Sequence, residues 1–173
     1  MKFYSGFSLK SDKHFFHEYI NDSLYTVAGF SYGAIKATLH VKKELSLGKR
    51  VDTLQLFSPA FFQTKSQKFK KLQTMAYIKS RDSYLRTFIE SCFLPYTNRS
   101  IEHKNSTLEE LEELLNYEFV KSDFLDLEAK GVKIEVYLGG KDSIIDAEGA
   151  RDFFLDVSTV TYIKNANHFL QID

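Results

Sequence analysis

The stretch Val27–Ala34, VAGFSYGA, places a Gly-x-Ser-x-Gly motif where an apolar run gives way to a helical pattern. Leu24–Ala28 is expected to be a strand, and Ala34–Leu47 repeats apolar residues at helical spacing up to Gly48. A serine on such a strand-to-helix turn has the context of a nucleophile elbow. The alternative is a glycine turn in which Ser31 only caps the helix.

The composition is that of one globular domain. The chain has 173 residues, of which 43% are hydrophobic and 27% charged. A net charge of zero argues against nucleic acid as a partner. No apolar run approaches the ~20 residues of a membrane helix, and the first residues lack the pattern of a signal peptide. The single cysteine, Cys92, suits a reducing compartment, so we expect a cytoplasmic protein.

Strands and helices are expected to alternate along the chain. Strands are predicted over 2–5, 51–60, 132–138 and 159–164, in addition to the strand before Ser31. Helices are predicted over 12–21, 67–79, 82–93, 107–118, 123–130 and 147–155, with Thr107 to Glu110 as a capping box. This alternation predicts an α/β fold with a parallel sheet and right-handed crossovers.

Partners for Ser31 follow two of the later strands. Asp142 comes just after strand 132–138, and His168 just after the last strand. Both would therefore emerge at the carboxyl edge of the sheet, in the chain order serine, acid, histidine. Asp146, four residues beyond Asp142, is a rival acid; Asp142 is favoured because it lies nearer the strand end.

These motifs together resemble the α/β-hydrolase family. The matching segments are GFSYG as the elbow, LQLFSPA as the next strand, GGKDSIID as the acid loop, NANHFLQ as the histidine loop and SGFS as the oxyanion loop. Within that family the chain is similar to the very short pimeloyl-acyl-carrier-protein methyl ester esterases of bacterial biotin synthesis. One departure is Ser5, which stands where the family's oxyanion loop has histidine.

The resemblance implies a set of roles. Ser31 would attack an ester carbonyl, His168 would take the proton, and Asp142 would orient His168. The backbone N–H groups of Tyr32 and Phe7 would form the oxyanion hole. The acyl channel would be lined by Phe7, Phe30 and Tyr32. No metal or organic cofactor is implied.

The same resemblance predicts a reduced fold. The core would comprise 1–60 and 131–173, and 61–130 would form a helical lid. The family's strands 1, 2 and 4 have no sequence to occupy, which leaves a five-stranded parallel sheet in the family order 3-5-6-7-8. All crossover helices would then cover one face. The other face would be exposed, covered by the insert, or buried in a homodimer.

Charge is unevenly distributed in the predicted lid. Residues 61–104 carry nine Lys/Arg and three Asp/Glu, a net of +6, and 105–130 carry two and eight, a net of −6. Either the two halves pair with each other, or the basic half docks an acidic partner. By the resemblance, that partner is an acyl carrier protein. The residues expected to contact it are Lys65, Lys68, Lys70, Lys71, Lys79 and Arg81.

The leading functional hypothesis is a serine carboxylesterase that converts the methyl ester of pimeloyl-acyl carrier protein to pimeloyl-acyl carrier protein and methanol. A general short-acyl esterase or thioesterase is one alternative, and a non-catalytic hydrolase-like binding protein is another. His14 and His17 lie three residues apart but have no third metal ligand at a suitable spacing. We expect them to be surface residues, and Cys92 to be a core residue.

Overall fold

A computed structural model describes all residues, 1–173, and contains the predicted parallel sheet. Its strand order is β1-β3-β4-β6-β7, and every neighbouring pair is parallel. The strands are β1 (Lys2–Tyr4), β3 (Thr26–Phe30), β4 (Thr53–Phe57), β6 (Lys133–Gly139) and β7 (Thr159–Ile163). Along the chain, each new strand of this sheet pairs with the strand before it. The prediction of five parallel strands in the family order 3-5-6-7-8 is therefore confirmed.

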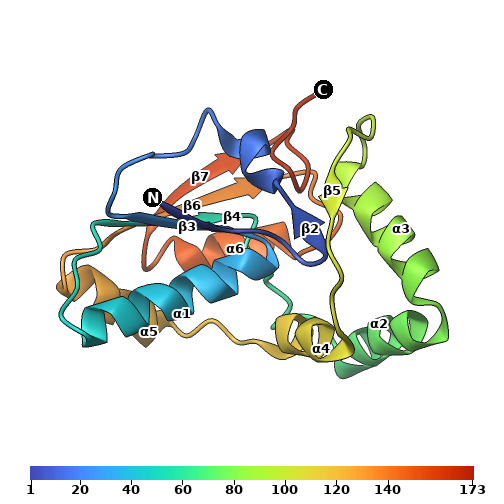
Figure 1. Cartoon of the computed structure of the whole chain (residues 1–173), viewed down its shortest axis with the longest axis horizontal. Coiled ribbons are helices and arrows are strands. Elements are labelled where there is room, and N and C mark those ends of the chain that lie inside the picture. The colour runs from blue at the N-terminus through green and yellow to red at the C-terminus, as the bar shows by residue number, and fades with distance from the viewer.

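Three crossover helices cover one face of the sheet. They are α1 (Tyr32–Ser46), α5 (Lys121–Ala129) and α6 (Ala147–Phe154), and all lie below the strands in Figure 1. The main core lies between these layers and includes Ile35, Leu54, Val136 and Phe154, all fully buried. Helices on one face are what right-handed crossovers with a constant direction of travel produce.

The opposite face is covered largely from within the chain. The 3₁₀ helix η1 (Asp12–Phe16) lies over the strands in Figure 1, and the Phe16 ring stacks on Phe57 at 4.7 Å between centroids. Residues 166–170 and the end of the insert around Phe93 complete this second core. Cover by the insert, one of the three predicted alternatives, is therefore present in part, whereas cover by the segment after β1 was not predicted. The helix in that segment, η1, ends at Phe16 and is therefore shorter than the predicted helix 12–21.

The insert forms an arm beside the sheet. It contains α2 (Gln67–Lys79), α3 (Arg81–Phe93) and α4 (Leu108–Asn116). A two-stranded ribbon of β2 (Leu9–Lys10) and β5 (Glu102–His103), which was not predicted, ties it to the first loop. Helix α5 belongs instead to the layer under the sheet, where Asp123 pairs with Lys42 of α1 at 2.8 Å. The arm is therefore shorter than the predicted lid 61–130.

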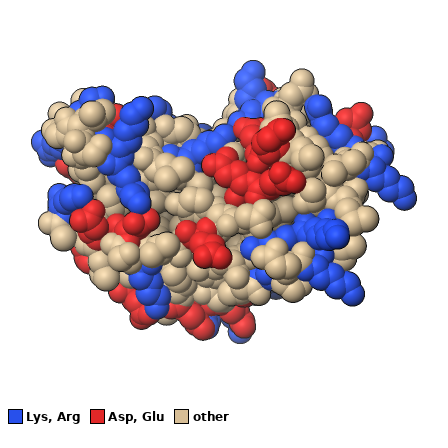
Figure 2. All heavy atoms as spheres, turned by 90° about the horizontal axis from the view of Figure 1, so that it is seen from below, with Lys and Arg blue, Asp and Glu red and all other residues tan.

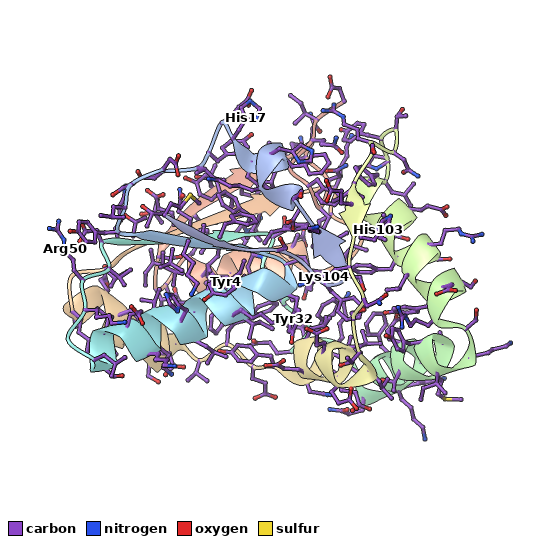
Figure 3. The ribbon with its side chains drawn as sticks, viewed as in Figure 1. Tyr4, His17, Tyr32, Arg50, His103 and Lys104 are labelled. Carbon is purple, nitrogen blue, oxygen red and sulfur yellow. The ribbon has the colours of Figure 1, made fainter.

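Helix α4 is fastened to the start of α1. The predicted capping box of Thr107 and Glu110 is present. Glu110 also accepts a hydrogen bond from Lys36 at 3.1 Å, and Glu113 accepts one from the Tyr32 hydroxyl. Figure 3 shows Tyr32 at the α1 end nearest α4. Burial, together with the bond to Glu113, raises the pKa of Tyr32, so the phenol stays a donor at neutral pH.

Candidate active site

Ser31 occupies the sharp turn between β3 and α1. Its φ of 52° and ψ of −116° are strained for a residue with a side chain. The backbone N–H of Ser31 donates to the Phe57 carbonyl at 2.9 Å, and the Ser31 carbonyl accepts from the Ala60 N–H at 3.2 Å. These bonds hold the strained turn in place, as a nucleophile elbow requires.

The two glycines of the motif allow close packing at this turn. A Cβ atom at Gly29 would clash with the carbonyl oxygen of Gly33, and one at Gly33 would clash with that of Tyr4. The backbones of strand β3, helix α1 and the end of β1 are therefore in close contact, with no side chain between them. The two glycines of the motif are therefore required by this close packing and not by a need for backbone flexibility.

Asp142 and His168 form a fully buried hydrogen-bonded pair. Oδ2 of Asp142 lies 2.6 Å from Nδ1 of His168, and both side chains are 0% exposed. Oδ1 of Asp142 accepts bonds from the N–H groups of Ile144 and Ile145, at 2.8 and 3.2 Å. The carboxylate thereby fixes the proton of His168 on Nδ1. Nε2 of His168 is buried and has no hydrogen-bond partner in the protein.

The rival acid serves another purpose. Asp146 is the N-cap of α6: its Oδ1 accepts from the Gly149 N–H at 3.0 Å and its Oδ2 from the Thr64 hydroxyl at 2.7 Å. These two bonds lower the pKa of Asp146. Asp142, and not Asp146, is the carboxylate that contacts His168.

Asn167 anchors the loop that carries His168, and sequence reasoning did not identify it. It is completely buried. Its Nδ2 donates to the Phe93 carbonyl at 2.8 Å and to Gln171, and its Oδ1 accepts from the N–H groups of Phe169 and Gln171. The signal available in the sequence was an amide beside the predicted base. Gly139 lets this loop pass, because a Cβ there would clash with the Asn167 carbonyl.

Ser31 and His168 are neighbours through Phe30. The Phe30 ring lies 4.9 Å from the imidazole of His168 and precedes Ser31 in the chain. The Ser31 hydroxyl makes no hydrogen bond within the protein. Catalytic hydrogen bonds in enzymes without substrate often form only on binding. The structure thus joins Asp142 to His168 directly and brings Ser31 to the same sheet edge.

The predicted oxyanion donors have free N–H groups. The Phe7 N–H makes no hydrogen bond within the protein, and Tyr32 is the first residue of α1, where no intrahelical acceptor exists. Gly6, the residue before Phe7, donates its N–H to the buried carboxylate of Asp12 at 2.8 Å. This bond holds the first loop with Phe7 beside Tyr32; their rings lie 6.3 Å apart.

Backbone strain is concentrated around this edge. Five non-glycine residues have positive φ: Ser8, Ser11, Ser31, Ser58 and Leu170. Ser8 and Ser11 lie between β1 and η1, Ser31 and Ser58 directly follow β3 and β4, and Leu170 lies two residues after His168. Strained residues of this kind gather at functional sites, where the surrounding structure holds them. None of the four besides Ser31 was identified from the sequence.

A cavity of about 560 Å³ lies between the arm and the loop after Asp142. Its apolar wall comes from Phe7, Phe62, Phe69, Phe88, Leu111 and Ile144, among others. Lys79 is its single charged lining residue. Of the three residues predicted to line an acyl channel, Phe7 lines this cavity, whereas Phe30 and Tyr32 do not. Phe30 instead packs in the second core, and Tyr32 faces α4.

The basic and acidic halves of the insert do not pair with each other. Acidic residues of α4 and α5 pair with α1 lysines instead, as in Lys36–Glu110 and Lys42–Asp123. In Figure 2 a red patch near the middle of the lower face has blue side chains beside it toward the arm. The predicted carrier-binding residues make no salt bridge; Lys70 alone is buried, and Arg81 donates to Asn105.

The remaining candidates from the sequence have ordinary surroundings. His14 and His17 are exposed and bond to backbone carbonyls, and no cluster of three or more metal-ligating side chains is present. Cys92 is a buried core residue, and this burial raises the pKa of its thiol. None of the helices has the length and apolar character needed to cross a membrane.

Neither protein-family models nor curated protein sequences match this chain. Among solved structures, naproxen esterase (carboxylesterase NP) from Bacillus subtilis is 17% identical, with a TM-score of 0.52, over 85% of this chain and 54% of the esterase. BioG from Haemophilus influenzae is 10% identical, with a TM-score of 0.58, over 97% of this chain and 87% of BioG.

A third match is E-2-(acetamidomethylene)succinate hydrolase, at 12% identity and a TM-score of 0.56, over 97% of this chain and 84% of the hydrolase. The chain spans 54 to 59% of the length of three larger matches, all named as hydrolases or esterases. At these identities the likeness establishes the fold. The chain has a reduced α/β-hydrolase fold.

Proposed function

We propose that this chain is a serine esterase that acts through Ser31, His168 and Asp142. The observation that carries the proposal is the buried His168–Asp142 hydrogen bond, which leaves Nε2 of His168 without a protein partner at the edge that holds Ser31. A buried imidazole with one nitrogen oriented by a carboxylate and the other free is the arrangement a general base requires. Several proteins of the same fold are named as esterases.

The reaction would proceed in two steps. Oγ of Ser31 attacks the ester carbonyl while Nε2 of His168 takes its proton and then passes it to the departing alcohol. Water next attacks the acyl-enzyme, again giving its proton to Nε2, and Ser31 is released. Asp142 keeps the Nδ1 proton in place and stabilises the imidazolium. The N–H groups of Phe7 and Tyr32 hold the oxyanion in both steps.

The substrate we propose is the methyl ester of a pimeloyl group carried by acyl carrier protein, with methanol as the leaving group. Its support is the resemblance of the sequence to the short pimeloyl esterases, together with the mostly apolar cavity whose lining includes Phe7 and Lys79. A chain threaded through this cavity would present its distal ester to Ser31. The thioester would stay near the outer end and be spared.

Helix α2 offers a surface for an acidic carrier. Lys68, Lys71 and Lys79 are exposed and have no ion-pair partner, and they flank an exposed apolar row of Leu72, Met75 and Ile78. Unpaired cations around apolar side chains suit an acidic protein that must dock with its acyl arm pointing inward. Replacing Lys68 and Lys71 by Glu should raise KM for a carrier-bound ester and leave a small free ester unaffected. Equal effects on both substrates would contradict this docking.

The first test is a mass assay of the pimeloyl-acyl-carrier-protein methyl ester with wild-type protein and with Ser31→Ala. Loss of one CH₂ from the substrate mass in the wild type alone supports both the chemistry and the substrate. Cleavage of a p-nitrophenyl ester but not of the carrier ester would leave a general short-acyl esterase. No cleavage of either ester would leave a hydrolase-like binding protein.

A further inference from the structure

Ser58 lies within the candidate site, although neither the motif nor the predicted triad includes it. It directly follows the last residue of β4. In the sheet, β4 lies between β3, which leads to Ser31, and β6, which leads to Asp142. Its N–H extends the ladder to the Tyr137 carbonyl at 2.8 Å. Phe57 directly precedes Ser58 and Ala60 lies two residues after it, and these two residues make the backbone bonds that hold Ser31.

The conformation of Ser58 is unfavourable for a serine in two respects. Its φ is 40°, in the left-handed region that favours glycine. It is also 0% exposed, and its hydroxyl has no hydrogen-bond partner in the protein. Both features cost free energy, and glycine would remove both. Ser8 makes the contrast clear, because it too is buried with positive φ but its hydroxyl bonds to Ser106.

An unpartnered buried hydroxyl at this edge has a use in the second step of the proposed reaction. Nε2 of His168 is likewise buried and unpartnered, and it must take a proton from the water that attacks the acyl-enzyme. A water held in a buried site needs two or more polar partners to be oriented. Nε2 supplies one of them.

We propose that Ser58 is a further catalytic residue, whose hydroxyl holds the hydrolytic water of the deacylation step; this rests on the proposed serine esterase function. The water donates one hydrogen bond to Nε2 of His168 and the other to Oγ of Ser58. Its oxygen bonds to the acyl carbon as its first proton moves to Nε2. The bond from that carbon to Oγ of Ser31 then breaks, and Nε2 returns the proton to Ser31. Ser58 is unchanged.

The test separates acylation from deacylation with p-nitrophenyl acetate. In Ser58→Ala the first turnover should release p-nitrophenol at nearly the wild-type rate. The steady-state rate should fall roughly 10- to 100-fold, the range expected for one hydrogen bond to a reacting, charged centre. Acetyl-enzyme should then accumulate and appear in the intact mass. Ser58→Gly, which also removes the backbone strain, should behave alike and melt at a higher temperature than wild type.

Thr26→Val is the matched control, because Thr26 has the other buried, unpartnered hydroxyl, at the opposite end of β3. It should leave both rates unchanged. Equal slowing of both steps in the Ser58 variants, or no slowing, would overturn the role of Ser58. If wild-type protein releases no p-nitrophenol, or Ser31→Ala releases as much, the proposed serine chemistry itself is overturned, and the role of Ser58 with it.

Discussion

At the scale of single residues, the site depends on a few side chains that can act only in one orientation. Asp142 uses one oxygen for the imidazole of His168 and the other for two backbone N–H groups. The carboxylate therefore cannot rotate without breaking three hydrogen bonds. Asn167 fixes the neighbouring loop in the same way, by using all of its polar atoms. Orientation here follows from complete hydrogen bonding.

Asp142→Asn should lower kcat by about 10⁴-fold with little change in stability. The amide oxygen can still accept from Ile144 and Ile145, but an amide N–H facing Nδ1 would force the wrong tautomer on His168. The comparison is steady-state esterase kinetics beside Asp146→Asn, which removes a charge four residues away. Asp146→Asn should keep wild-type activity; the reverse pattern would transfer the acid role to Asp146.

Gly139→Ala should damage the site by displacing its base. The added Cβ would collide with the carbonyl of Asn167, which is backbone and cannot swing aside. We expect a destabilisation of about 1–3 kcal/mol and a loss of kcat larger than the change in KM. Denaturant unfolding and kinetics measure the two effects. Gly131→Ala, at a positive φ of 86° with open space around it, should reduce stability without a specific loss of kcat.

At the scale of elements, helix ends place the functional groups. Helix α1 begins at Tyr32, directly after Ser31, so its free N–H groups face the same edge as Ser31. Helix α6 begins at Ala147, and its cap Asp146 closes the loop that starts with Asp142. The capping box of α4 places Glu110 against Lys36 of α1. Each cap therefore serves its helix and also fixes a loop or a neighbouring element.

Asp146→Ala should destabilise the fold by about 1 kcal/mol at pH 7 through loss of the α6 cap. Because the pKa of Asp146 is lowered in the folded state, its contribution is full above the unfolded value near 3.9 and is lost as pH falls through the folded-state pKa. The gap between wild type and variant in urea unfolding should therefore close below about pH 4. Asp152→Ala, an exposed change in the same helix, should show no such gap.

At the scale of the whole molecule, the lysines and the acidic residues of the insert lie mainly on different helices. Glu110 and Glu113 of α4 and Asp123 of α5 contact α1. In α2, by contrast, Lys68, Lys71 and Lys79 are exposed and have no ion-pair partner. The chain as a whole is neutral, so attraction for an acidic partner can come only from this local separation.

The value of kcat/KM for a carrier-bound ester should fall as salt rises from about 0.01 to 0.5 M, because the Debye length shrinks from about 30 Å to less than 8 Å. The same salt series with a small neutral ester should be flat, since no charge steers it. Lys68→Glu with Lys71→Glu should remove most of the salt dependence. A parallel decline for both esters would indicate an effect on the enzyme rather than on docking.

The sequence by itself determined the order of strands and helices and the single-sided crossovers, and it predicted Ser31, Asp142 and His168 as a candidate triad at the same sheet edge. This information is local, because turn residues, apolar periods and the ends of strands can be read within short windows. The tertiary structure decided what depends on contacts between distant segments. It covered the second face with η1 and moved α5 into the core layer. It also turned Phe30 and Tyr32 away from the cavity, placed Asn167 beside His168, and placed Ser58 on the strand next to the one that leads to Ser31. Close packing and hydrogen-bond completion choose among distant segments, and neither leaves a periodic signal in the chain.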